Sequence, residues 1–191
     1  VGAGALDANT TASYNTAVGK NALGANTTGA TNTAVGDSCL DANTTASYNT
    51  GVGCNSLSAN TTGTRNTAVG YDAMKDNVDG GDNSAFGEGA LKSNTSSIRN
   101  TALGRASLAS ITSNSNRHVA VGYAALVSLT GGNENVAVGN EAGQAMTTGD
   151  SNTIVGSYAG DALTTGGQNT AIGRAALSTA TTASYNVAVG Y

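Results

Sequence analysis

Large aromatic side chains and proline are almost missing from this sequence. Among its 191 residues there is no Pro and no Trp, Phe86 is the single Phe, and charged residues make up 10%, against about 25% in typical soluble proteins. A core built from large aromatic side chains is therefore excluded. Hydrophobic residues still reach 39% and no block of like charge is present, which argues against a disordered tail.

Basic patches and long apolar runs are missing as well. The eight Lys and Arg residues are scattered and the net charge is −4, so the chain lacks the basic footprint of a nucleic-acid-binding protein. No apolar run approaches the roughly 20 residues that cross a bilayer. We therefore expect no nucleic-acid partner and no membrane insertion of this segment. Both chain ends lie inside a repeated motif, so we expect a fragment of a longer repeat protein.

What the sequence has instead is the motif Asn-Thr-Ala-Val-Gly, repeated along the whole chain. Ten of the eleven intervals between motif glycines are 17 residues and one, from Gly104 to Gly122, is 18. The glycines are Gly2, Gly19, Gly36, Gly53, Gly70, Gly87, Gly104, Gly122, Gly139, Gly156, Gly173 and Gly190. A period this strict indicates a solenoid, and 17 residues are too few for a helix-pair repeat.

Each repeat predicts one coil of a parallel β-solenoid. The residue before the glycine is Val, Ile, Leu or Phe in every copy, which favours a strand, and the connecting segments are rich in the turn formers Asn, Thr, Ser and Gly. We expect a short strand, a bend at the glycine, a second extended stretch that carries Ala-Leu, and a wide turn. The fold class is all-β, with about eleven coils in a single domain over residues 1–191.

The strand offers two faces, and one of them must fill the coil. Side chains alternate along a strand, so Thr16 and Val18 share one face while Asn15 and Ala17 share the other. Val, Leu and Thr make a thin interior, and its burial offsets little of the ordering entropy of 17 residues. We therefore assign the small, uncharged Asn and Ala positions to a buried contact between copies of the chain. The predicted interface residues are Asn15, Ala17, Asn32, Ala34, Asn66, Ala68, Ala85, Ala102, Ala120, Ala137, Ala171 and Ala188. The alternative is a monomer with an internal Asn ladder and a flat, exposed Ala face.

The second stretch changes midway along the chain. The fourth residue after the glycine is Leu or Met as far as Leu126, and then becomes Gly at Gly143 and Gly160. The seventh residue changes from Asn to the apolar Met146 and Leu163. The apolar side chain thus moves three residues along while the coil keeps its length, which predicts one continuous core.

The motif resembles that of a known group of fibrous proteins. The segments "EAGQAMTTGDSNTIVG" (Glu141 to Gly156) and "YAGDALTTGGQNTAIG" (Tyr158 to Gly173) are similar to repeats of phage tail fibres. They also resemble the coil of YadA-type trimeric autotransporter adhesin heads. The resemblance covers the whole chain. It implies a left-handed parallel β-roll, a homotrimer, and an extracellular location on a virion or cell surface.

Few residues suggest chemistry. His118, the single His, replaces the repeated Asn in the 18-residue coil, and we interpret it as a structural substitution whose extra residue bulges outward. Asp76, Asp79 and Asp82 form the sharpest acidic cluster, a weak Ca²⁺ candidate beside the simpler interpretation of a solvated turn. No catalytic residue and no cofactor is expected.

The remaining polar and aromatic positions follow the repeat. Cys39 and Cys54 lie in neighbouring coils at different positions, too far apart for an unstrained disulfide, so free thiols are expected. The Asn-Thr-Thr turns create five glycosylation sequons that the repeat itself explains. Three tyrosines precede the motif Asn and three follow the glycine; exposed Tyr side chains can contact glycans, and local packing is the alternative.

The favoured function is a structural segment of a trimeric extracellular fibre that supports attachment to a host cell or surface and is not an enzyme. A cell-surface glycan or protein receptor is then contacted through other parts of the fibre. The alternative is an ice-binding solenoid that uses the Thr column at the eighth residue after the glycine, as at Thr27 and Thr44. A polysaccharide-cleaving enzyme is disfavoured because its carboxylates would have to cluster in a groove.

Overall fold

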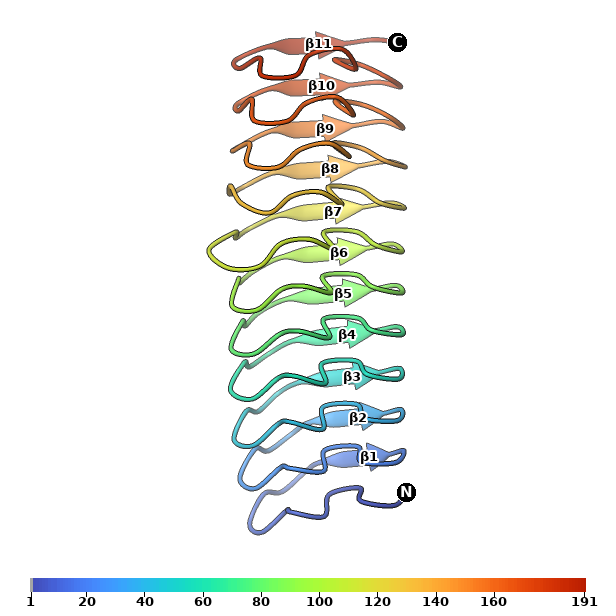
Figure 1. The fold of residues 1–191 in the computed structure, drawn as a ribbon, viewed down its shortest axis with the longest axis vertical. Helices are drawn as coiled ribbons and strands as arrows, with labels where there is room; N and C mark the ends of the chain where they lie inside the picture. Colours follow the sequence, from blue (N-terminus) through green and yellow to red (C-terminus); the bar gives the residue numbers. More distant parts are fainter. Residues whose placement is uncertain (1) are drawn as a thin grey trace.

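Each coil contributes one three-residue strand, and the strands stack in chain order in a computed structural model that describes residues 2–191 (Figure 1). All eleven strands pair in parallel in one sheet, which confirms the all-β parallel solenoid. The strands are β1 (Thr16–Val18), β2 (Thr33–Val35), β3 (Thr50–Val52), β4 (Thr67–Val69), β5 (Ser84–Phe86), β6 (Thr101–Leu103), β7 (Val119–Val121), β8 (Val136–Val138), β9 (Thr153–Val155), β10 (Thr170–Ile172) and β11 (Val187–Val189).

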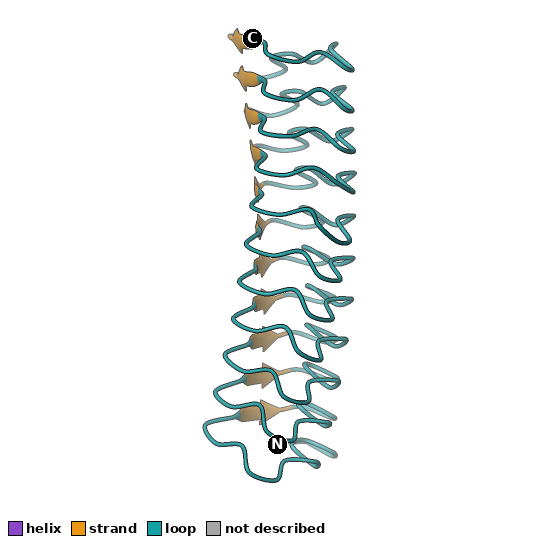
Figure 2. Cartoon of the chain, turned by 90° about the vertical axis from the view of Figure 1, so that its left-hand side faces the viewer, coloured by secondary structure: helices purple, strands orange, loops and turns teal. Residues whose placement is uncertain are grey.

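The coils are in register from one end of the rod to the other. Thr16 pairs with Thr33 and Val18 with Val35, and the same pairing continues to β11. The sheet lies along one side of the rod and the turns along the other, with the two termini at opposite ends (Figure 2). At about 4.8 Å per strand, the sheet is about 48 Å long. Among residues 2–191 there is no helix of the length and hydropathy that a bilayer crossing requires.

The motif glycine ends each strand for two reasons. From Gly19 to Gly190 its φ lies between +122° and +145°, a region that only Gly adopts readily. A Cβ on Gly70 would also stand 2.6 Å from the carbonyl oxygen of Gly87 in the next coil. The predicted bend at the glycine is confirmed, and it combines a positive φ with close backbone approach.

The segment after the glycine is not the extended stretch that the sequence suggested. Residues 20–25 form successive turns, in which the amide of Ala22 donates to the carbonyl of Gly19 and that of Gly24 donates to Asn21. Leu23 has a φ of +51°, and equivalent residues in other coils adopt similar angles. Because positive φ disfavours branched side chains, the burial of Leu must outweigh this strain. The prediction failed because an Ala-Leu pair carries no turn signal.

The 18-residue coil accommodates its extra residue at the surface. Thr112, Ser113 and Asn114 are all exposed, and the loop between β6 and β7 projects beyond its neighbours (Figure 1). The pairing of Thr101 with Val119 is undisturbed. The predicted outward bulge is confirmed.

Candidate interaction face

The residues predicted to form the subunit interface lie inside the coil. The equivalent positions of successive coils form a column along the rod. In the Ala column, Ala34, Ala68, Ala85, Ala102, Ala120, Ala137 and Ala171 are 0% exposed within one chain, and so are Asn32 and Asn66 of the Asn column. Ala17, in the first strand, packs against the same core. Asn15 and Ala188, in the end coils, are half-buried. The interface prediction for these residues is therefore wrong, and the Val column that was assigned to the interior lies outside.

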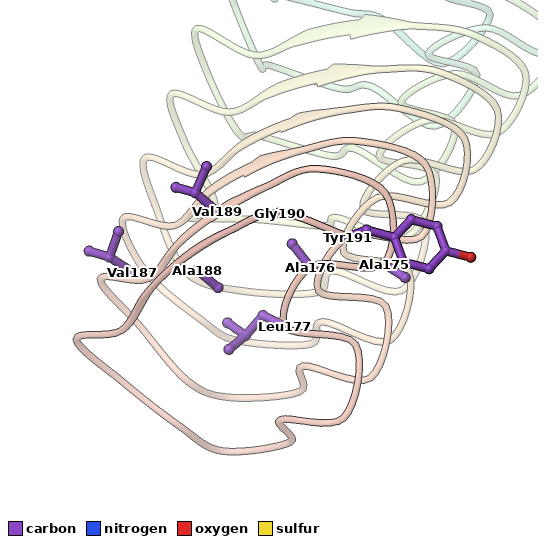
Figure 3. Close-up of a pocket in the computed structure, with 8 residues that line it drawn as sticks. All are labelled: Ala175, Ala176, Leu177, Val187, Ala188, Val189, Gly190 and Tyr191. Carbon is purple, nitrogen blue, oxygen red and sulfur yellow. The ribbon is translucent and has the colours of Figure 1, made fainter.

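The cause is the narrow interior of a 17-residue coil. The close-up of the last coil shows Ala188 directed toward Leu177 and Ala176, while Val187 and Val189 point away from the coil (Figure 3). Since the Leu of the turn segment reaches across to the sheet, only a small residue fits opposite it. Ala satisfies this and Val does not.

Exceptions in the Ala column show how tightly this space is packed. Cys39 stands at the third position after the motif glycine, where other coils have Ala or Ser, and the Ala column has Gly51 beside it. A Cβ on Gly51 would lie 2.5 Å from the Cys39 sulfur. Ile154 replaces Ala where the facing residues are Gly143 and Gly160, whose added Cβ atoms would lie 3.3 and 3.1 Å from the Ile154 Cδ1. These size exchanges are visible in the sequence, and they are the signal that could have placed the Ala column inside.

Two ladders of asparagine side chains complete the interior. In the Asn column, the Asn32 Oδ1 accepts a hydrogen bond from the backbone amide of Asn49 at 2.9 Å, and its Nδ2 donates to the Ala46 carbonyl at 2.8 Å. In the second ladder, the Asn43 Nδ2 donates to the Asn26 Oδ1 at 2.8 Å. The second ladder runs Asn9, Asn26, Asn43, Asn60, Asn77 and Asn94. The internal ladder of the alternative interpretation is therefore confirmed, but the exposed Ala face that went with it is wrong, because the Ala column is buried.

His118 takes the place of one ladder asparagine. Its Nδ1 accepts from the amide of Asn135 at 3.1 Å, so this nitrogen carries no proton, and its Nε2 lies 3.2 Å from the Gly132 carbonyl and 2.9 Å from the Ser115 Oγ. Burial lowers the pKa of His118 to about 4; Arg117 acts in the same direction, while the Gly132 carbonyl and Asp150 oppose it. The imidazole copies the donor and acceptor of an Asn side chain, which supports its structural role.

The outward side of the sheet is the candidate interaction face. It consists of two columns that we call together the Thr/Val face. The Thr column is Thr16, Thr33, Thr50, Thr67, Ser84, Thr101, Val119, Val136, Thr153, Thr170 and Val187, and the Val column is Val18, Val35, Val52, Val69, Phe86, Leu103, Val121, Val138, Val155, Ile172 and Val189. Neither column contains a charged residue. Leu103 is 49% exposed and Phe86 is 39% exposed, so the face is an uncharged surface along the rod, with an apolar Val column beside a column of mostly Thr.

Charged residues lie beside this face and on the turns. Arg65 pairs with Asp82, Arg105 with Glu88 and Arg117 with Glu134, each across one coil boundary. These exposed pairs contribute little to stability. Asp72 differs from these exposed charges, because it is 4% exposed. Its burial alone would raise its pKa, but the hydrogen bond from Asn55 and the contacts with Lys92 and Lys75 hold the pKa below its usual value.

The weak calcium candidate does not form a cluster. Within residues 2–191 no group of three or more Asp, Glu, His or Cys side chains is placed to hold a metal ion, and Asp82 lies 3.8 Å from Arg65 instead of joining Asp76 and Asp79. The two cysteines are free, as expected. Burial raises the pKa of the Cys39 thiol to about 12, so Cys39 is inert as a nucleophile.

The threonine and asparagine turns also have structural partners. In the column proposed for ice binding, the Thr27 hydroxyl donates to the Thr44 carbonyl at 3.0 Å, and equivalent bonds recur along the rod. These hydroxyls are therefore engaged with the next coil. Four of the five sequon asparagines, Asn26, Asn43, Asn60 and Asn94, are 0% exposed, so they are inaccessible in the folded chain, as the structural interpretation of the sequons requires.

The tyrosines are mostly exposed, and some are covered by arginine. Arg105 lies 5.7 Å from the ring centre of Tyr123, and Arg174 lies 5.4 Å from that of Tyr191. Tyr14, by contrast, is 87% exposed. Local packing thus accounts for part of the second group, and contact with a glycan stays a prediction. Comparison of the chain with protein-family models, curated proteins and solved structures found no match.

Proposed function

We propose that this chain is a structural, non-catalytic segment of an extracellular fibre, of the phage tail-fibre or surface-adhesin kind, in which three copies pack along their Thr/Val faces. The observation that carries the proposal is the uncharged face, with its exposed apolar Val column, on one side of a rod whose own core is already filled. Receptor binding belongs to other parts of such a fibre, and this segment supplies length and stiffness.

The size of the face supports burial against a partner. A sheet about 48 Å long and two outward columns wide offers about 600 Å² per copy, so a trimer that buries all of it removes about 1,800 Å² from water. The size of one copy's face is at the upper end of the largest apolar patches on typical monomers, which are often functional.

The spacing of the face supports a second copy of this chain as the partner. Its ridges recur at each strand, about every 4.8 Å, and another copy has ridges of the same spacing over the same length. Unrelated globular surfaces lack such a period. Self-association therefore fits this face better than binding to an unrelated protein.

The mass of the native assembly tests the proposal. We expect a trimer in sedimentation experiments. Val52→Glu places a charge on the Thr/Val face and should yield folded monomers, whereas Thr62→Glu, on an exposed turn, should leave the trimer intact. A monomeric native protein, or equal assembly of the two variants, would contradict the proposal.

Ice binding is a second candidate, now on a different surface. The hydroxyls of Thr16, Thr33, Thr50 and Thr67 point outward beside a Val column and, within residues 2–191, do not bond to neighbouring coils, unlike the turn threonines. A flat, regular array of hydroxyl and methyl groups is the kind of surface that could order water. Thermal hysteresis of the native protein that disappears in Thr50→Leu would favour this function; its absence would exclude it.

A further inference from the structure

Strand β5 carries an unusual pair of residues on the Thr/Val face. Its Val-column residue is Phe86, the largest in that column, and its Thr-column residue is Ser84, the smallest in its own column. On a surface that meets only water, a large residue needs no small companion. A paired increase and decrease in size is expected where both columns pack against another surface.

Symmetry decides which columns meet between copies. When copies are parallel and related by rotation about an axis along the rod, the Val column of one copy lies against the Thr column of the next. When two copies are antiparallel and face to face, Val columns meet Val columns with the strand order inverted. Phe86 of one copy can therefore meet Ser84 of another at the same height only in a parallel, in-register assembly.

We infer that Phe86 and Ser84 act as a peg and socket that fix the register between parallel copies of this chain. The inference rests on the proposed self-association. A repeated face needs such a device because displacement by one coil, about 4.8 Å, would otherwise recreate nearly the same contacts. With the peg in place, displacement by one coil puts Phe86 against Thr67 or Thr101, which carry a methyl group that Ser84 lacks.

Exchange of peg and socket provides the test. Ser84→Phe alone sets Phe against Phe and should raise the dissociation constant of the assembly about 100-fold, while Phe86→Ser alone leaves a cavity and should raise it about tenfold. The double variant Ser84→Phe/Phe86→Ser should return to within a few-fold of the native value. Sedimentation over a dilution series, in mild urea where association is tight, measures these constants. Circular dichroism confirms that each outward substitution leaves the coil folded.

A control pair displaced by one coil distinguishes the possible registers. Thr67→Phe/Phe86→Ser should show no recovery, because Thr67 lies on β4 and not on β5. If tight association returns in Thr67→Phe/Phe86→Ser and not in Ser84→Phe/Phe86→Ser, the copies are displaced by one coil. If it returns in neither double variant, the peg and socket is excluded. A native monomer would instead contradict the proposed function itself, so the two failures are distinguishable.

Discussion

The two halves of the rod fill the same coil in different ways. In the N-terminal half a Leu or Met stands four residues after the motif glycine and a laddered Asn seven residues after it, as with Leu57 and Asn60. In the coils that begin at Gly139 and Gly156, the fourth residue after the motif glycine is Gly and the seventh is Met146 or Leu163. Ile154 replaces Ala in the strand between these two segments. The sheet continues unchanged across both halves. Only the second amide ladder is therefore replaced by apolar packing, because the Asn column stays hydrogen-bonded through Asn152 and Asn169.

The largest loss of stability is expected when the seventh residue after the motif glycine is exchanged between the two halves. Asn60→Leu interrupts the second ladder, because it leaves the Asn43 Oδ1 without its donor and removes the acceptor of the Asn77 Nδ2. Leu163→Asn removes apolar packing and buries an amide without an Asn neighbour in its column. We expect each to lower the free energy of unfolding by about 4 kcal/mol in urea titrations. Leu163→Met, which copies Met146, is the conservative control and should cost under about 1.5 kcal/mol. If Asn60→Leu and Leu163→Asn lower the free energy of unfolding no more than Leu163→Met does, the two halves do not differ in how they fill the core.

Truncation of Ile154 should have the next largest effect. Ile154→Ala empties the space between Gly143 and Gly160 and should cost about 3 kcal/mol. The double variant Ile154→Ala/Gly143→Leu recreates the coil of Leu126, whose φ of +52° is close to the +63° of Gly143. It should recover more than half of the loss in thermal or urea unfolding. If the double variant is no more stable than Ile154→Ala alone, Leu at position 143 does not fill the space that Ile154 leaves.

His118, between the two halves, should make the rod sensitive to acid. Because its pKa is about 4 in the folded chain and about 6.5 when unfolded, the unfolded state binds the proton more readily at intermediate pH. Its contribution to stability is complete above pH 6.5 and is lost as the pH falls toward 4, by a total of about 3 kcal/mol. His118→Asn should remove this slope between pH 6.5 and 4. An unchanged slope in His118→Asn would assign the acid sensitivity to other groups.

The smallest effect is expected where the halves are alike. Thr27 and Thr164, one in each half, donate a side-chain hydrogen bond to the backbone of the next coil. Thr27→Val and Thr164→Val should each cost about 1 kcal/mol or less, because the lost bond is partly exposed. Unfolding midpoints that differ strongly between the two variants would show that the halves also differ in their turns.

Much of the fold could be predicted from residue spacing. The strict interval between motif glycines predicted parallel coils and their register, since each residue must stack on its equivalent in the next coil. The move of the apolar side chain from Leu126 to Met146 predicted one continuous core. The bend at the motif glycine and the bulge of the 18-residue coil also followed from local chemistry. The turns around Leu23 could not be predicted, because their positive φ is imposed by neighbouring coils and not by the residue type.

The candidate site was predicted in kind but placed on the wrong face. Alternation along Asn15-Thr16-Ala17-Val18 determined by itself that two faces exist, that both are small or apolar, and that neither is charged. Only the tertiary structure decided which one is inside, because that depends on the width of the coil. The Leu opposite the sheet leaves room for Ala and for an asparagine that bonds the backbone above it, so the bulkier Val is directed outward.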